Sequence, residues 1–549
     1  MMRNMRPRLA FVVLQLCHVR GLLPRAAPRW RPATARAAVD GPLRRSAAFW
    51  GYAAPVAARY AGDRAKLWYR EAVLRECLDE AECAAIWDEA HVSGAEQIRK
   101  AVDELGGFYV KVGQLVATRK DLFPRQYGKG LAGLTDFVDP LDPAVVRRAV
   151  EERVLAPIGA KWGDVFASWD NAPLGAASVA QVHRATLTAA YGGLDVAVKV
   201  QRPNVEQRLL GDIAQLKSVA KPLRTALPVD YYTVLSELER QLAGELDFVA
   251  EAAAMERVFA TLNSDADTGA PVTPPVVVPR VVSALSCREV IVMSYLDGEP
   301  LSRVAARMAD AAPAQKRLLG AQLLGALTDA FGRCILDDGF FHADPHPGNL
   351  LVLRDGRIGL IDFGQVKQIS GMTRATLARL MIALAARTKS EGTAATPDEM
   401  ARIVDLGLEL GVRLAPGAPA EGPAAVAMWI FDGAREQLPG GFEQSELSPK
   451  SPATALASFP QDLVLVARAA VLVKGIAAAL DVDWSLAQRW APVGAAALDR
   501  QKRPPRDTRV RFRTIAATAR AWVAGKARRA AVRVLKWVRP GLFPPPPPR

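Results

Sequence analysis

The chain has 549 residues, half of them hydrophobic, so it is long enough for two or three domains and too apolar to be largely disordered. Its net charge of +14 is concentrated at the two ends, because residues 1–39 contain no acidic residue and residues 501–549 contain only Asp507. No nucleic-acid-binding module accompanies this charge, and the five cysteines contain no Cys-x-x-Cys pair, which argues against a nucleic-acid partner, a disulfide framework and a zinc site.

The N-terminal segment, residues 1–40, is rich in Arg and broken by Pro. Its apolar run from Leu9 to Leu16 is too short to span a bilayer. This composition is typical of an organelle transit peptide, and a disordered basic tail is the alternative.

Helical periodicity follows over residues 41–161 and includes a short motif at Lys111, Gly113 and Gln114. Lys111 and Gln114 are three residues apart and share one helix face, while Gly113 allows another element to pack closely. Judged from these residues alone, the segment is an amphipathic helix with a solvated Lys.

The next region predicts a nucleotide-covering loop between two strands. The loop spans Pro173–Ser178, and strands are expected over Val179–Ala185 and Leu194–Val200, the second of which carries Lys199. A Lys at this place is able to reach phosphates. Ala and Ser replace most of the usual glycines, so the candidate nucleotide-binding residues of the loop are Gly175, Ala176, Ala177 and Ser178.

A single helix is expected over Leu235–Phe259, with acidic residues at 245, 247 and 251. At about 100° per residue, Asp247 and Glu251 share a face and Glu245 points away from both. One of these acids could pair with Lys199 and another could face a different cation. The alternative is a solvated acidic face, and the sequence leaves open which Glu would pair with Lys199.

A strand is predicted at Glu289–Met293, followed by a hinge between two lobes at Ser294–Gly298. Met293 and Tyr295, beside that hinge, are the remaining candidate nucleotide-binding residues.

The most informative motif places Asp344 five residues before Asn349 and the Asp of Asp362-Phe363-Gly364 thirteen residues after it. A kinase site needs a carboxylate at the acceptor and an amide and a second carboxylate for metal ions, at such intervals. The interval between the two expected metal ligands is predicted to be a hairpin of Leu350–Leu353 and Ile358–Ile361, which returns both ligands to one place.

Helices of an α-rich second lobe are expected at Gln315–Asp338 and Thr373–Arg387. The apolar segment Leu463–Leu480 contains Arg468 and Lys474, and charges at those depths favour a buried lobe helix over a membrane span. Beyond it, residues 515–538 predict a basic amphipathic helix for a membrane surface or a partner, and Pro544–Pro548 ends the chain as an unpacked tail.

Taken together, four motifs resemble those of the UbiB/ADCK family of atypical, protein-kinase-like proteins, also called aarF-domain kinases. They are the Lys-x-Gly-Gln motif at 111–114, the Ala-rich loop at 175–178, the Glu-x-Asp motif at 245–247 and the His-x-Asp…Asn motif at 342–349. The resemblance covers roughly residues 96–498. Two departures from ordinary kinases stand out, since Ala343 replaces the usual Arg and no Ala-Pro-Glu follows Gly364.

The resemblance implies an α+β, bilobal protein-kinase-like fold, with a small β-containing N-lobe, an α-rich C-lobe and a helical N-terminal extension over the active site. The expected regions are the transit segment (1–40), the helical extension (41–165), the N-lobe (166–295), the C-lobe (296–500) and the basic, Pro-rich tail (501–549).

The expected chemistry is ATP binding with two divalent cations, Mg²⁺ or Mn²⁺. Lys199 would contact the phosphates, with Glu245 or Glu251 orienting it. Asn349 and Asp362 would hold the metal ions, and Asp344 would position or deprotonate the nucleophile. Lys111, Gly113 and Gln114 would form a gating motif above the pocket, pairing with the remaining acid.

The resemblance further implies support of isoprenoid-quinone or related lipid metabolism at a mitochondrial or plastid membrane. The expected partners are ATP, an anionic membrane surface, a lipid or quinone precursor and a lipid-biosynthetic protein complex. The alternatives are a small-molecule phosphotransferase, a conventional protein kinase and a non-catalytic nucleotide-sensing scaffold.

Overall fold

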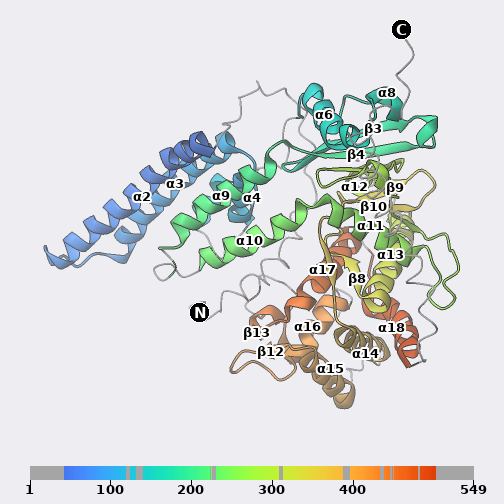
Figure 1. Cartoon of the computed structure of the whole chain (residues 1–549). Helices are drawn as coiled ribbons and strands as arrows, with labels where there is room; N and C mark the ends of the chain where they lie inside the picture. Colours follow the sequence, from blue (N-terminus) through green and yellow to red (C-terminus); the bar gives the residue numbers. More distant parts are fainter. Residues whose placement is uncertain are drawn as a thin grey trace, which may run out of the picture.

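The structure, a computed structural model, describes residues 42–118, 124–131, 140–222, 224, 230–307, 313–387, 396–432, 438–444, 448, 450–479 and 482–502. Within these residues the fold is α+β and bilobal: Figure 1 shows a helical extension to one side of a small sheet, with a mainly helical lobe below it. The predicted transit segment, the helix at 515–538 and the proline run lie outside the described residues.

The extension begins with a helical hairpin of α2 (Pro42–Ala72) and α3 (Glu80–Leu105), followed by α4 (Phe108–Thr118) and α5 (Arg125–Gly130). α3 begins where the Asp79 side chain accepts a hydrogen bond from the backbone of Ala81, and it ends at Gly106, whose φ of 57° suits glycine. These helices agree with the helical pattern of the sequence.

A buried ion pair fixes the hairpin to the N-lobe. Arg45 donates from two nitrogens to the Asp212 carboxylate at 3.0 and 2.6 Å, and from its third to the Leu105 carbonyl at 2.8 Å. Because Asp212 lies on α9 (Val205–Ala220), the pair joins the extension to a helix that directly follows one strand of the N-lobe sheet, β4 (Asp195–Gln201).

The N-lobe is an antiparallel sheet in the order β1-β3-β4-β6, with the short β2 also paired to β3. Its alternating apolar residues pack on one side against α6 (Pro143–Val150) and on the other against α11 (Phe248–Leu262). The strands span Phe166–Trp169 (β1), Gly175–Ala176 (β2), Ala180–Leu187 (β3), Asp195–Gln201 (β4) and Val290–Ser294 (β6).

The expected single helix over 235–259 is wrong. The chain forms α10 (Tyr231–Glu245) and then α11, with a break at Leu246 and Asp247. Asp247 has extended backbone angles and accepts hydrogen bonds from Val249 and Ala250, so it caps α11 and does not share a helix face with Glu251.

The C-lobe contains the predicted hairpin and most of the helices. β9 (Leu350–Leu353) pairs antiparallel with β10 (Ile358–Leu360), as the sequence predicted, and β7 (Gly298–Pro300) and β5 (Val276–Val277) complete that sheet. β8 (Phe340–His342) pairs with β11 (Val366–Gln368). The helices are α12 (Leu301–Arg307), α13 (Pro313–Gly332, continued by a π-helical segment Arg333–Asp338), α14 (Gly371–Ala386), α15 (Pro397–Glu409), α16 (Gly422–Phe431), α17 (Gln461–Ala479) and α18 (Leu486–Lys502).

The apolar helix α17 lies inside the C-lobe, with Val466 and Ala470 fully buried among the neighbouring helices. This confirms the choice of a buried helix for the segment. Among the described residues, none of the helices combines the length and apolar character needed to cross a bilayer.

Candidate active site between the lobes

Lys199 on β4 joins the two lobes through carboxylates from both. Its ammonium lies 2.7 and 3.0 Å from the two oxygens of Glu251 on α11, and 3.1 Å from Asp362 Oδ1 in the C-lobe. The structure therefore brings together three of the predicted site residues and assigns the pairing that the sequence left open to Glu251.

The charges in this cluster support one another. Burial opposes the positive charge of Lys199, but the Asp362 and Glu251 carboxylates outweigh it and raise the Lys199 pKa. The Lys199 cation lowers the pKa of Asp362 to about 2. Burial raises the pKa of Glu251, against the attraction of Lys199. Lys199 and Asp362 are therefore charged at neutral pH, and half of the Asp362 side chain faces the open site.

His342 forms hydrogen bonds to the backbone of Asp344, the predicted catalytic aspartate, and to the backbone of Asp362, a predicted metal ligand. Its Nδ1 accepts a hydrogen bond from the Asp344 amide at 3.1 Å, and its Nε2 lies 2.7 Å from the Asp362 carbonyl. Since a carbonyl only accepts, the proton belongs on Nε2 and the ring is neutral. Asp362 has φ = 61°, a left-handed conformation that Asp tolerates better than most residues, and His342 holds it there.

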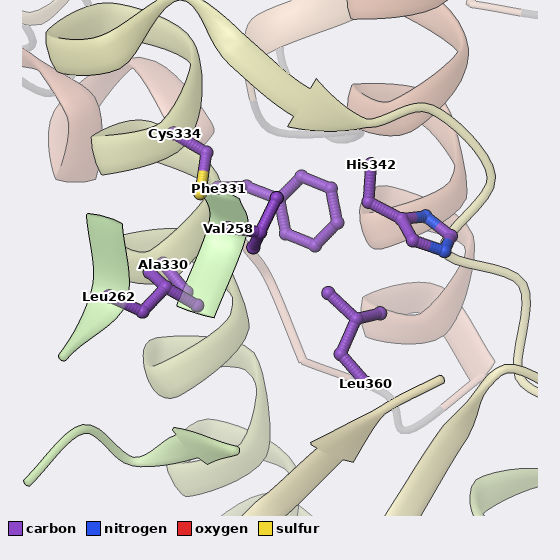
Figure 2. Close-up of a pocket in the computed structure, with 7 residues that line it drawn as sticks. All are labelled: Val258, Leu262, Ala330, Phe331, Cys334, His342 and Leu360. Carbon is purple, nitrogen blue, oxygen red and sulfur yellow. The ribbon is translucent and has the colours of Figure 1, made fainter. Parts of the chain in front are cut away.

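One side of His342 lines a small apolar cavity. Figure 2 shows the cavity between α11, α13 with its π-helical continuation, and β10. Burial in this setting lowers the pKa of His342. The lining residues are Val258, Leu262, Ala330, Phe331, Cys334, His342 and Leu360.

The hairpin of β9 and β10 places Asn349 beside Asp362. Leu350 pairs with Leu360, and the amide of Ile361 donates to the carbonyl of Asn349 at 3.0 Å, so the two predicted metal ligands are adjacent to paired residues. The Asn349 amide nitrogen donates to the Asp344 carbonyl at 3.1 Å, which leaves its side-chain oxygen as a ligand.

This donor set fits a hard divalent cation. One carboxylate and one amide oxygen suit Mg²⁺, which takes its remaining ligands from phosphates and water. Among the described residues, no three His, Cys, Asp or Glu side chains are grouped as a metal site.

Asp344 has a partner that sequence reasoning missed. Arg468 on α17 donates to Asp344 Oδ1 at 2.8 Å and to Gln365 Oε1 at 3.1 Å, and the Gln365 amide donates to Glu245 at 3.0 Å. The predicted orienting residue Glu245 therefore contacts this chain of polar groups and has no described contact with Lys199. The charges within the apolar segment 463–480 were the one signal that could have indicated Arg468.

The Ala-rich loop is the edge of the sheet above Lys199. Gly175 and Ala176 form β2 and pair with Val182 and Gln181 of β3, and the amide of Ala177 donates to the Ala180 carbonyl at 2.8 Å. The expected loop thus contains a short strand, and Ser178 begins the turn into β3. An added methyl group at Gly175 would meet no atom within 4 Å, and its φ is ordinary, so no backbone requirement for glycine exists there.

The hinge residues lie at the outer edge of the same sheet. Met293 is buried on β6 and pairs with Ala197, while the amide of Tyr295 donates to the Asp195 carbonyl at 2.9 Å. The Arg184 guanidinium lies 4.4 Å from the centre of the Tyr295 ring. Arg184 pairs with Ala197, which lies on the Lys199 side of the sheet, so Tyr295 borders the face that would cover a nucleotide.

The predicted gating motif lies on α4, beside the helices that carry Glu245 and Asp212. Phe108 of α4 packs in one buried cluster with Leu209 of α9 and with Leu242 and Leu246 at the end of α10. Gly113 is buried. The side chains of Lys111 and Gln114 lie outside the described part of the structure, so their gating role stays a prediction.

Comparison with protein families places this site in a known group. Residues 133–394 match the family model described as the ABC1 atypical kinase-like domain. The matched residues include the whole Lys199, Glu251 and Asp362 cluster together with Asp344 and Asn349.

Curated proteins give the same result. Uncharacterized protein slr0889 of Synechocystis is 32% identical over 301 residues, which is 54% of this chain and 71% of that protein. Protein ACTIVITY OF BC1 COMPLEX KINASE 1, chloroplastic, of Arabidopsis thaliana is 33% identical over 290 residues, 52% of this chain and 39% of that protein. A probable protein kinase UbiB of Shewanella piezotolerans is 33% identical over 266 residues, 48% of this chain and 45% of that protein. The chain thus spans less than half the length of the last two relatives.

A solved structure of Rv3197 with erythromycin, from Mycobacterium tuberculosis, is 25% identical and aligns with a TM-score of 0.38. The alignment covers 73% of this chain and 97% of that one.

Proposed function

Because this chain belongs to the UbiB/ADCK family, whose common part is the ABC1 atypical kinase-like domain, we propose that it is an atypical kinase or ATPase that binds ATP with a divalent cation. The observation that carries the proposal is the position of Lys199, whose ammonium lies within 3.1 Å of both Glu251 and Asp362. A Lys held between a helix carboxylate and a metal-binding Asp is the arrangement that kinases use to hold phosphates.

In the proposed mechanism, Lys199 contacts the α- and β-phosphates while Glu251 orients it. Asn349 and Asp362 would hold the cation, which would supply electrostatic stabilisation of the transferred phosphoryl group. Asp344 positions or deprotonates the nucleophile, and Arg468 fixes the rotamer of that carboxylate. The chain's own contribution is therefore mainly positioning and electrostatic stabilisation.

The short connection after Gly364 favours hydrolysis or phosphorylation of a small molecule over phosphorylation of a protein. β11 begins at Val366 and returns along β8, and α14 already begins at Gly371. This leaves no long loop after Gly364 to form a docking platform for a peptide. The packing of α4 on α9 and α10 is a second observation in favour of ATP chemistry that is shielded from protein substrates.

We further propose that the activity supports isoprenoid-quinone or related lipid metabolism at an organelle membrane. Two Arabidopsis relatives carry the word chloroplastic in their names, and the first 39 residues are basic and acid-free, which supports a plastid or mitochondrial location. Acidic lipid headgroups would suit the basic ends of the chain.

The test measures ATP hydrolysis by the protein with and without anionic liposomes and a quinone precursor, beside Asp362→Asn. The proposal expects hydrolysis that the liposomes stimulate and that the substitution abolishes. Activity that ignores both the lipid and the substitution would contradict it.

Each alternative predicts a different result in an assay of its own. A soluble phosphorylated product identifies a small-molecule phosphotransferase, and phosphate transfer to peptides identifies a conventional protein kinase. Retained cellular function in Asp344→Asn, together with loss in Asp362→Asn, identifies a nucleotide-sensing scaffold.

A further inference from the structure

The outward face of α2 is apolar along its whole length. Ten positions of this helix fall within one arc of about 100° when each residue advances 100°, and all ten are exposed. Three are large, with exposed fractions of 86% for Leu43, 45% for Trp50 and 63% for Trp68. The ten residues, called the α2 stripe below, are Leu43, Ala47, Trp50, Ala54, Ala57, Ala58, Ala61, Ala65, Trp68 and Ala72.

The opposite face of α2 already has partners. Phe49 is buried in a cluster with Val102 and Leu105 of α3, and Arg45 reaches Asp212 on α9. A helix that packs on one side normally presents charged residues on the other, and a continuous exposed apolar face marks an interaction surface. Figure 1 shows the α2–α3 hairpin projecting away from both lobes, so the α2 stripe is accessible to a large partner.

The spacing of the two Trp residues makes the α2 stripe self-complementary in an antiparallel pairing. Trp50 and Trp68 are 18 residues apart, which is five turns at 3.6 residues per turn, so both point the same way about 27 Å apart. Every stripe position between them is Ala. We propose that the α2 stripe binds the α2 stripe of a second copy of this chain, antiparallel, with the two-fold axis near the level of Arg59.

This register pairs large residues at the ends and small residues at the centre. Trp50 of one copy packs against Trp68 of the other, twice, as a two-fold interface requires. Ala57 of one copy meets Ala61 of the other at the crossing point, and such small side chains let the helix axes approach to the short end of the usual range of about 8–10 Å.

The charges beside the α2 stripe are compatible with this pairing. Arg64 is exposed at one flank, and in the proposed register it lies opposite Ala54 of the second copy. Arg59 is level with its own copy at the two-fold axis, but it points about 150° away from the centre of the α2 stripe and pairs with Asp63, so the two arginines do not face each other across the contact.

A membrane surface suits the α2 stripe less well. Helices that lie in a bilayer interface bury Trp, Phe and Leu, whereas seven of these ten residues are Ala, which gain little from entering lipid. The helix is about 46 Å long at 1.5 Å per residue, so the contact is near the lower size limit of specific interfaces and the dimer is expected to be reversible.

Sedimentation velocity of the full chain over a concentration series tests the proposal, with Ala61→Glu as the disrupting variant. Buried like charges at the crossing should weaken self-association by at least about tenfold. Ala84→Glu adds the same charge to an exposed position of α3 and should leave self-association unchanged. Circular dichroism verifies that both variants are folded, and ATP hydrolysis, measured at a protein concentration where the chain is monomeric, should be equal in both.

Cross-linking tests the orientation. A mixture of Trp50→Cys and Trp68→Cys proteins should form disulfide-linked dimers faster than either variant alone, with the unsubstituted protein giving the background of the native cysteines. Faster cross-linking of Trp50→Cys with itself would overturn the antiparallel register. A chain that is monomeric at all concentrations would overturn the proposal altogether, as would unchanged self-association in Ala61→Glu. If that variant also loses binding to anionic vesicles in a co-sedimentation assay, the α2 stripe binds a membrane surface instead.

Discussion

Arg468, from the apolar helix α17 of the C-lobe, donates a 2.8 Å hydrogen bond to the carboxylate of Asp344. Both side chains are mostly buried, with about one sixth of each exposed. The second nitrogen of Arg468 binds Gln365, which in turn binds Glu245. The carboxylate of Asp344, which is expected to lie beside the phosphate acceptor, is thus held by a planar guanidinium that also binds Gln365.

We predict that Arg468→Lys lowers turnover about tenfold while changing the KM for ATP by less than about twofold. Lys lacks the planar fork with which Arg468 holds Asp344 and Gln365 from two nitrogens, so the carboxylate loses its fixed rotamer while the phosphate contacts remain. Steady-state ATP hydrolysis measures both constants. Arg379→Lys, at an exposed ion pair with Glu409, is the matched control, and an equal loss in both variants would contradict the assignment.

The two glutamates of the acidic region should behave differently. Glu251→Gln removes one of the two carboxylate partners of Lys199 and should weaken binding of ATP with Mg²⁺ about tenfold. Because burial raises the pKa of Glu251, a neutral Gln is expected to be tolerated by the fold. Glu245→Gln keeps an acceptor for Gln365 and should change ATP affinity less than about twofold. Isothermal titration calorimetry compares them, and the reverse ranking would assign the pairing to Glu245.

Local sequence signals predicted the parts of this site that depend on local geometry. The β9–β10 hairpin has apolar strands joined by the turn at 354–357, so its register and the adjacency of Asn349 and Asp362 followed from spacing. The prediction of one helix over 235–259 fails at Leu246–Asp247 because it assigns Asp247 to an acidic helix face. An Asp directly before an apolar helical run is also an N-cap signal, which is the interpretation that the structure supports.

Contacts that depend on tertiary packing had no such signal. Arg468 and Asp344 are 124 residues apart, and nothing local distinguishes a basic side chain that binds a carboxylate, as Arg468 does, from one that binds a backbone carbonyl, as Lys474 does. The same holds for the Arg45 and Asp212 pair, which determines how the extension sits on the N-lobe.

Protonation of His342 should destabilise the protein as the pH falls. Burial lowers the folded-state pKa of His342 below its ordinary value of 6.5, so the unfolded chain takes up this proton at higher pH than the folded chain. Stability from this residue is present above about pH 6.5 and is lost as the pH falls toward the folded pKa, by at most about 1.4 kcal/mol per pH unit. Urea unfolding between pH 7.5 and 5 measures this slope.

The comparison for that experiment is His342→Gln, which keeps a donor for the Asp362 carbonyl but does not titrate. The slope should decrease without vanishing, since burial also lowers the pKa of His183 and of His91. An unchanged slope would show that His342 is not the group that titrates.

Breaking the ion pair between Arg45 and Asp212 should loosen the helical extension. Arg45→Met leaves the Asp212 carboxylate buried without its partner, at a cost of about 3–5 kcal/mol. The double variant Arg45→Met/Asp212→Leu should recover much of this loss. Thermal unfolding measures the stability, and hydrogen exchange shows whether α2 and α3 open first. A double variant no better than Arg45→Met would mean that the charges themselves are not the cause.

Two substitutions of Asp362 separate the effect of its charge on ATP binding from the effect of its backbone conformation on stability. Asp362→Asn removes the negative charge beside Lys199 but tolerates the left-handed φ of 61°, so it should abolish metal-dependent ATP binding with little loss of stability. Asp362→Ala removes the same charge and adds backbone strain of about 1–2 kcal/mol, because Ala rarely adopts this conformation. Titration with Mn²⁺ and ATP, together with urea unfolding, measures both effects. If Asn and Ala destabilise the fold equally, the left-handed conformation is not under strain, and if Asp362→Asn still binds ATP only with metal, another residue holds the cation.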